Sequence, residues 1–164
     1  MSVNLQWIVG LWLAFIGWFL EIAATISYRQ ALMRDALQGL SVRDVMTVDW
    51  PLIRRGLSLE RLVQDYILRT GRQSFIVAVE DRLEGIVTLR DIKRVSHERW
   101  QTTLVEEIMA PSDKLKIAYP NQDALSLFEQ MDELSIAQVP VVEGRDVVGM
   151  VDRDSLVHLL RTRK

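Results

Sequence analysis

Thr88 and Asp91 are the residues of this chain whose types and spacing are best suited to binding a ligand. They stand three residues apart, where a predicted buried strand, Gly85–Thr88, turns into a predicted helix that begins near Leu89. A hydroxyl and a carboxylate at such a junction can cap the first helical turn or bind a ligand. The carboxylate accepts hydrogen bonds from hydroxyl groups, and a helix N-terminus favours a phosphate. The residues alone leave both the ligand site and the simple helix cap open.

The junction occurs twice, because the chain contains an internal repeat. The pattern around Gly85 returns around Gly149, 64 residues later. At the same spacing, Ser74–Val79 matches Gln138–Glu143. The two leading segments, Val42–Thr47 and Val105–Ala110, are 63 residues apart. One residue must therefore be gained or lost within the repeat.

Each copy predicts a leading segment that includes Met, then a helix, two strands joined by a turn, and a closing helix. We expect the first unit over residues 42–103 and the second over residues 104–164. The first unit is expected to hold a helix over 59–67, strands over 75–79 and 85–88, a turn over 80–82 and a helix over 89–95. The second is expected to hold a helix over 124–131, strands over 139–142 and 147–151, a turn over 143–146 and a helix over 153–160. Two such units packed together form one adequate core.

The first 27 residues differ from the rest in charge and are expected to form a transmembrane helix. Leu5 to Ile26 is apolar apart from Gln6, Glu21 and Thr25. As a helix this run would be roughly 33 Å long, enough for a hydrocarbon core of about 30 Å. Arg29 and Arg34 follow it, which places the C-terminal side in the cytoplasm by the positive-inside rule. A buried core helix stays an alternative, whereas a cleaved signal peptide is disfavoured because no basic residue precedes the apolar run.

Residues 28–41 are expected to form a helix that connects this membrane span to the repeats, with Gly39 as its stop. The whole-chain charge of −2 offers no basic field for nucleic acid. The absence of cysteine excludes disulfides and thiolate zinc sites.

The sequence contains no complete catalytic motif. A zinc peptidase needs His-Glu-x-x-His, but Gln101 stands where the second histidine would follow His97 and Glu98. His158 is far away along the chain. No glycine-rich phosphate loop ending in Gly-Lys is present. We therefore expect the chain alone to be no enzyme and to hold no metal.

The repeated motifs resemble the cystathionine β-synthase (CBS) domain. The likeness is carried by Val-Arg-Asp-Val-Met-Thr at 42–47, the strand pair, and Gly-Ile-Val-Thr-x-x-Asp at 85–91. Two copies in order are similar to the usual tandem CBS pair, an α+β fold of two β-α-β-β-α units related by a pseudo-twofold axis. The resemblance implies a regulatory module that binds an adenine nucleotide: ATP, ADP or AMP.

The same resemblance implies which residues would bind the nucleotide. In the first copy these are Thr88 and Asp91, with Thr47 and Phe75 as further binding residues. The second copy departs from the family pattern, since Asp152 stands where Thr or Ser is expected and Ser155 where Asp is expected. A carboxylate at that position would repel a phosphate, so we expect the second copy not to bind a nucleotide.

A further resemblance covers the N-terminal part. The apolar run at 11–20, the Arg-bearing segment after it and the leading segment at 42–47 are similar to the C-terminal end of site-2-type zinc peptidases, where a last membrane helix leads into a cytoplasmic CBS pair. This implies a single-pass protein of the cell membrane that is the C-terminal part, or a detached partner, of an intramembrane peptidase. The alternative is a scaffold in which the CBS pair forms a homodimer and holds a membrane complex together without a nucleotide.

Overall fold

The structure, a computed structural model, describes residues 34–156. The predicted transmembrane helix over 1–27 lies outside these residues, as do His158 and the second half of the expected last helix. The chain divides into two compact units, Met1–Gln38 and Gly39–Lys164. The described part of the first unit is helical over 34–37. Gly39 has a φ of +80°, the left-handed conformation that commonly follows a helix end, so the connecting helix ends before residue 41.

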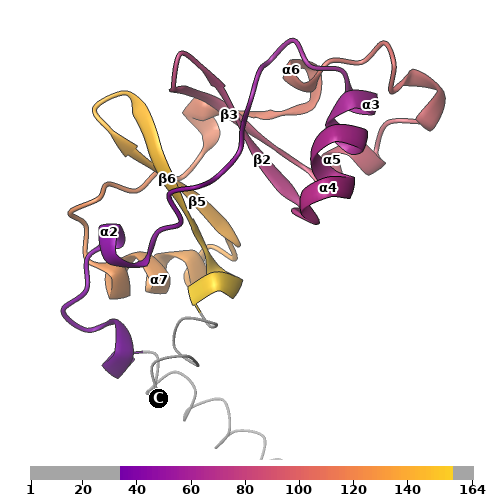
Figure 1. The fold of residues 1–164 in the computed structure, drawn as a ribbon. Helices are drawn as coiled ribbons and strands as arrows, with labels where there is room; N and C mark the ends of the chain where they lie inside the picture. The colour runs from indigo at the N-terminus through magenta and orange to yellow at the C-terminus, as the bar shows by residue number, and fades with distance from the viewer. Residues whose placement is uncertain (1–33, 157–164) are drawn as a thin grey trace, which may run out of the picture. The chain divides into compact units, whose positions relative to one another are not determined.

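The second unit is built on one mixed sheet with the strand order β1-β2-β3-β6-β5 (Figure 1). The strands are β1 (Leu52–Ile53), β2 (Ser74–Val79), β3 (Arg82–Thr88), β4 (Ala110–Pro111), β5 (Gln138–Glu143) and β6 (Asp146–Asp152). β2–β3 and β5–β6 are antiparallel hairpins, β1 runs parallel to β2, and β4 pairs with β3 outside the main path. The four main predicted strands are therefore present, and all begin earlier than expected.

The hairpin turns are shorter than the sequence predicted. Glu80 and Asp81 have φ values of +50° and +63°, and Arg82 already belongs to β3. A two-residue loop with both central residues at positive φ matches the right-handed twist of the flanking strands. The second hairpin turns at Gly144, whose φ is +68°, and Arg145.

The helix of the first copy is interrupted by a π-helical stretch. α3 (Leu59–Arg61) runs into the π-helix η1 (Leu62–Ile67) and then into α4 (Leu68–Thr70). The second copy has a regular helix instead, α7 (Ala124–Glu133). The remaining helical segments are short: α2 (Val42–Val45), α5 (Leu89–Lys93), η2 (His97–Arg99), α6 (Val105–Ile108) and η3 (Ser112–Lys114). Residues 153–156 are helical at the start of the expected last helix.

The two copies pack with pseudo-twofold symmetry. The two hairpins meet where Arg82 of β3 pairs with Asp146 of β6, two residues that are themselves 64 positions apart. Each copy also sends its leading segment across to the other copy. Thr47 pairs with Met150 of β6, and Ala110 pairs with Ile86 of β3. α2 accordingly lies beside α7 of the second copy (Figure 1).

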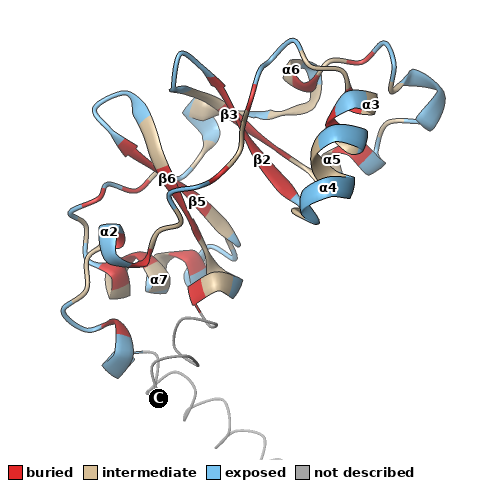
Figure 2. Cartoon of the chain, viewed as in Figure 1, coloured by how far each residue is buried: buried red, intermediate tan, exposed pale blue. Residues whose placement is uncertain are grey.

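The core lies on both faces of the sheet (Figure 2). Phe75, Val77 and Val87 pack against the helices of the first copy. The opposite face of the same strands packs toward the second copy, in a cluster of Trp50, Ile76, Ala78, Ile86 and Met150. This second cluster lies where the copies meet, and it includes Ile86, which stands two residues before Thr88 on β3.

Candidate ligand site at the end of β3

Thr88 and Asp91 are held together by a closed set of hydrogen bonds at the junction of β3 and α5. The backbone N–H and the hydroxyl of Thr88 donate to Asp91 Oδ2 at 3.0 and 2.6 Å. The backbone N–H of Asp91 donates to Thr88 Oγ1 at 3.3 Å. This reciprocal arrangement is a capping box, which satisfies backbone donors at the start of the helix.

The capping box leaves Asp91 part of its capacity to accept further hydrogen bonds. Asp91 Oδ1 forms a long ion pair with a guanidinium nitrogen of Arg94, at 3.9 Å. The Asp91 side chain is 24% exposed. An ionised carboxylate offers about four acceptor positions. α5 has only five residues, so its dipole adds little and any ligand would be held by side chains.

The other two predicted binding residues lie in different surroundings. Phe75 is next to Ser74, which pairs with Thr88, but its ring is fully buried in the core and packs edge-on against Tyr66. Thr47 pairs with Met150 of β6 in the second copy, because the leading segments are exchanged. The structure therefore brings Thr88 and Asp91 together, places Phe75 in the neighbouring strand with its ring pointing into the core, and puts Thr47 beside the opposite hairpin.

The corresponding junction of the second copy has different chemistry. β6 ends at Asp152, and the backbone N–H of Asp154 donates to Asp152 Oδ1 at 3.1 Å. Asp152 thus occupies the structural position of Thr88. The main-chain junction is the same, since Arg153 N–H donates to Ala137 O just as Leu89 N–H donates to Gln73 O.

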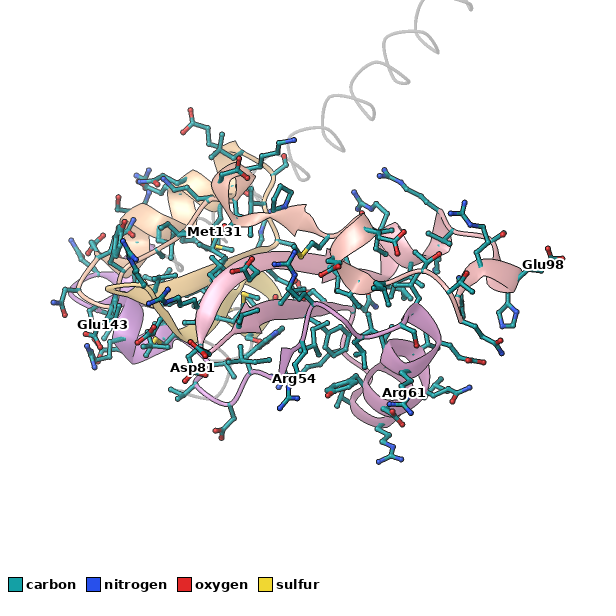
Figure 3. All side chains as sticks on the ribbon, turned by 90° about the horizontal axis from the view of Figure 1, so that it is seen from above. Arg54, Arg61, Asp81, Glu98, Met131 and Glu143 are labelled. Carbon is teal, nitrogen blue, oxygen red and sulfur yellow. The ribbon has the colours of Figure 1, made fainter. Side chains whose placement is uncertain are left out.

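An open cavity of about 630 Å³ lies at the other end of β2, away from Thr88. It is lined by Leu52–Arg55 and Ala78–Asp81, and Arg54 and Asp81 both lie along the lower edge of the molecule in Figure 3. Arg55 pairs there with Glu106 and Glu84. The hydrogen bond and the charge of Glu106 raise the pKa of Arg55. Because arginine is already protonated in proteins, this shift leaves its positive charge unchanged.

Within residues 34–156 no group of acidic or histidine side chains is arranged to hold a metal ion. Glu98 of the partial His-Glu motif is the middle residue of η2 and projects outward (Figure 3), and His97 packs against Trp100. Over the same residues no helix is long and apolar enough to cross a bilayer.

Sequence reasoning missed Ser74, which pairs directly with Thr88, and Trp50, which packs with Ile76 and Ile86 where the two copies meet. Both are buried, and neither Ser74 Oγ nor Trp50 Nε1 has a hydrogen-bond partner among the described residues. For Ser74 the available signal was a serine in an apolar strand, because its place opposite Thr88 depends on the pairing of β2 and β3.

Solved structures of similar fold support the architecture. The CBS domain pair of protein MJ0100, in complex with 5-methylthioadenosine and S-adenosyl-L-methionine, has a TM-score of 0.64 at 22% identity and covers 76% of this chain and 98% of that one. CBSX2 in complex with AMP has a TM-score of 0.67 at 18% identity and covers 77% of this chain and all of the other. At these identities the likeness establishes the fold.

Sequence comparison adds a curated relative and a family. Rip3 of Mycobacterium tuberculosis, named as a candidate zinc metalloprotease, is 31% identical over 153 residues, which is 92% of this chain and 39% of that protein. The chain spans about two fifths of the length of the curated zinc metalloprotease relatives that it matches. The model of the CBS domain matches twice, over residues 42–98 and 105–162. Together with the paired and exchanged hairpins, this confirms the expected repeat, and the chain belongs to the CBS domain family as a tandem pair.

Proposed function

We propose that this chain is a non-catalytic regulatory module that senses an adenine nucleotide through Thr88 and Asp91. The observation that carries the proposal is the partly exposed Asp91 carboxylate, which is held in place by Thr88 at the end of a central strand. Hydroxyl groups of a ribose suit the remaining acceptor positions of that carboxylate. Related folds that bind AMP or S-adenosyl-L-methionine support the adenine-nucleotide class.

The site is well placed for regulation, because Thr88 is the last residue of β3. β3 pairs with β2, β4 and β6 and so contacts strands from both copies. A ligand that binds one arrangement of these strands better than another shifts the balance between the two arrangements. In this proposal the shift passes through residues 28–41 to the membrane segment.

The proposed association is with a site-2-type intramembrane zinc peptidase, as its C-terminal part or a detached partner. The match to Rip3 covers 153 residues, which is longer than the whole span 42–162 of the two CBS matches. It therefore includes part of the segment before residue 42, where the sequence predicts a single membrane span with the CBS pair on the cytoplasmic side. A neighbouring reading frame that encodes a membrane protein with His-Glu-x-x-His would support a detached partner, and a frame without one would count against it.

The second candidate function is a dimerisation scaffold. Leu68 on α4 and Leu134 at the end of α7 are 74% and 57% exposed, and they lie on the corresponding helices of the two copies. Exposed leucines on two equivalent helices suit a contact with a second chain. This candidate predicts a dimer that forms without a nucleotide.

Calorimetric titration of the full chain in detergent with AMP, ADP and ATP tests the sensor. We expect binding of at least one nucleotide, and a loss of affinity of tenfold or more in Asp91→Asn. Asp123→Asn is the matched control, because Asp123 caps α7 by accepting from Ser126 N–H at 2.8 Å and lies outside the site. No binding of any of the three nucleotides would remove the sensor function. Sedimentation with and without nucleotide then distinguishes a ligand-dependent assembly from a constitutive scaffold.

A further inference from the structure

The cavity at the far end of β2 has the size of a small-molecule site and lies away from Thr88. Its volume is about 630 Å³, and ligand pockets in proteins commonly hold a few hundred Å³ or more. β1 ends at Ile53, whereas its parallel partner β2 continues to Val79. After β1 the chain approaches α6, where Arg55 O accepts from Glu106 N–H at 3.4 Å. The cavity lies between the residues that follow β1 and the end of β2.

In the second copy an ion pair bridges the two corresponding walls. Arg43 N–H donates to Pro120 O at 2.9 Å, and the Arg43 guanidinium donates to Glu143 at 2.8 Å. Glu106 corresponds to Arg43 by the spacing of the leading segments, and Val79 corresponds to Glu143 by the spacing of the strands. A valine cannot pair with a carboxylate, and Val79 is left 39% exposed. The described residues of the first copy therefore form no equivalent bridge across the cavity.

The cavity combines apolar atoms with opposite charges on its two walls. Arg54 follows β1, and Glu80 and Asp81 form the turn after β2. All three side chains are exposed, and none has a hydrogen bond or an ion pair within residues 34–156. Arg55 differs, because two carboxylates already pair with it. The apolar atoms come from both strands, namely from Leu52, Ile53, Ala78 and Val79.

We propose that this cavity binds a free α-amino acid with an apolar side chain. The ligand's carboxylate pairs with the Arg54 guanidinium, whose planar fork matches that group. Its ammonium group pairs with Glu80 or Asp81, and its side chain contacts the apolar atoms between the walls. A simple anion is repelled by the two carboxylates and a simple cation by Arg54, so a zwitterion suits all three charges. This site is separate from the proposed nucleotide site and does not depend on it.

L-Leucine is the probe, and NMR spectra of the ¹⁵N-labelled full chain in detergent micelles report where it binds. We expect L-leucine to shift the backbone amide signals of residues 53–55 and 78–81. N-acetyl-L-leucine lacks the ammonium charge and L-leucinamide lacks the carboxylate. Each should bind about fivefold more weakly, which is what one exposed ion pair can contribute. If L-leucine shifts none of these signals, or if either derivative binds as well as L-leucine, the inference is wrong.

Arg54→Gln tests the wall that follows β1. We expect about fivefold weaker binding of L-leucine and unchanged binding of L-leucinamide, because the amide has no carboxylate for Arg54 to pair with. Arg61→Gln is the matched control, since Arg61 is also exposed and lies on α3 outside the cavity. Equal weakening of both ligands by Arg54→Gln would contradict the assigned pairing.

The double variant Glu80→Gln with Asp81→Asn tests the turn. Asparagine tolerates the left-handed conformation that Asp81 adopts at a φ of +63°, so the turn should persist. We expect about fivefold weaker binding of L-leucine and unchanged binding of N-acetyl-L-leucine. Asp113→Asn, an exposed position in η3, is the control. An unchanged affinity for L-leucine in the double variant would rule out recognition of the ammonium group.

The same spectra separate this inference from the proposed function. Shifts with AMP near residues 88–91 but none with L-leucine near 78–81 would refute the amino-acid site and leave the nucleotide site standing. Shifts with L-leucine alone would have the opposite meaning.

Discussion

The carbonyl oxygen of Ala110 lies only 2.5 Å from the position that a β-carbon on Gly85 would take. The equivalent contact in the other half joins Gly149 to the carbonyl oxygen of Thr47, at 2.9 Å. In each case the methionine of the crossing segment, Met109 or Met46, also packs against the glycine. Methionine is flexible enough to fill the space beside a bare backbone. The glycine and methionine of the repeat are thus two sides of one contact between copies.

Gly85→Ala is expected to destabilise the protein by about 1–3 kcal/mol, because the new methyl group would overlap a backbone atom that a side-chain movement cannot clear. Urea unfolding followed by circular dichroism measures the change. Gly56→Ala is the control, since no atom lies within 4 Å of its added β-carbon and its φ is not in the left-handed region. We expect that control to stay within about 0.5 kcal/mol of the parent chain. Equal effects at both glycines would contradict the close crossing.

Asp91→Ala and Asp123→Ala should each cost about 1 kcal/mol of stability, because each carboxylate caps the start of a helix. Thermal unfolding of the two variants measures this. Only Asp91→Ala is expected to weaken nucleotide binding as well. If Asp123→Ala weakened it equally, the loss would reflect general destabilisation and not a contact with the ligand.

The double variant Asp152→Thr with Ser155→Asp should create a second nucleotide site. It copies the residue types of Thr88 and Asp91 onto a junction with the same main-chain hydrogen bond. It also removes the Asp152 carboxylate, which would repel a phosphate. Calorimetry is expected to show the stoichiometry rise from one nucleotide per chain to two. A stoichiometry that stays at one would mean that other residues of the first copy are required.

Deletion of Gln64, an exposed residue of η1, should convert the π-helix into a regular helix and leave the fold intact. The stretch from the N-cap Ser58 to Ser74 is one residue longer than that from Asp123 to Gln138, and a π-helical turn accommodates one inserted residue. Circular dichroism and urea unfolding measure the result.

The matched deletion is Glu129 in the regular helix α7. Because α7 has no extra residue, this deletion rotates the fully buried Met131 out of its core position and should unfold or strongly destabilise the protein. If the Gln64 deletion were as damaging, the π-helix would have a structural role of its own.

The extra residue also explains the change of repeat spacing from 63 to 64. The connection from Met109 to Asp123 in the second copy is two residues longer than that from Met46 to Ser58 in the first. The helix of the first copy is one residue longer than that of the second, so the net difference is one residue. The sequence predicted a net change of one residue but not its two parts. Apolar residues such as Leu59, Leu62, Tyr66 and Ile67 fit an α-helical period closely enough to conceal a single inserted position.

The sequence by itself determined the duplication, the two hairpins and the strand-to-helix junction that carries Thr88 and Asp91. These features depend on hydrogen bonds and side-chain periods over a few residues, which local spacing encodes. Only the tertiary structure decided that the leading segments exchange between copies, so that Thr47 lies beside Met150 and not beside Thr88. It also decided that Ser74 is buried opposite Thr88 and that Trp50 is buried where the two copies meet. Such neighbours come from packing between segments distant in sequence, where many registers satisfy the same apolar pattern and only the complete core selects one.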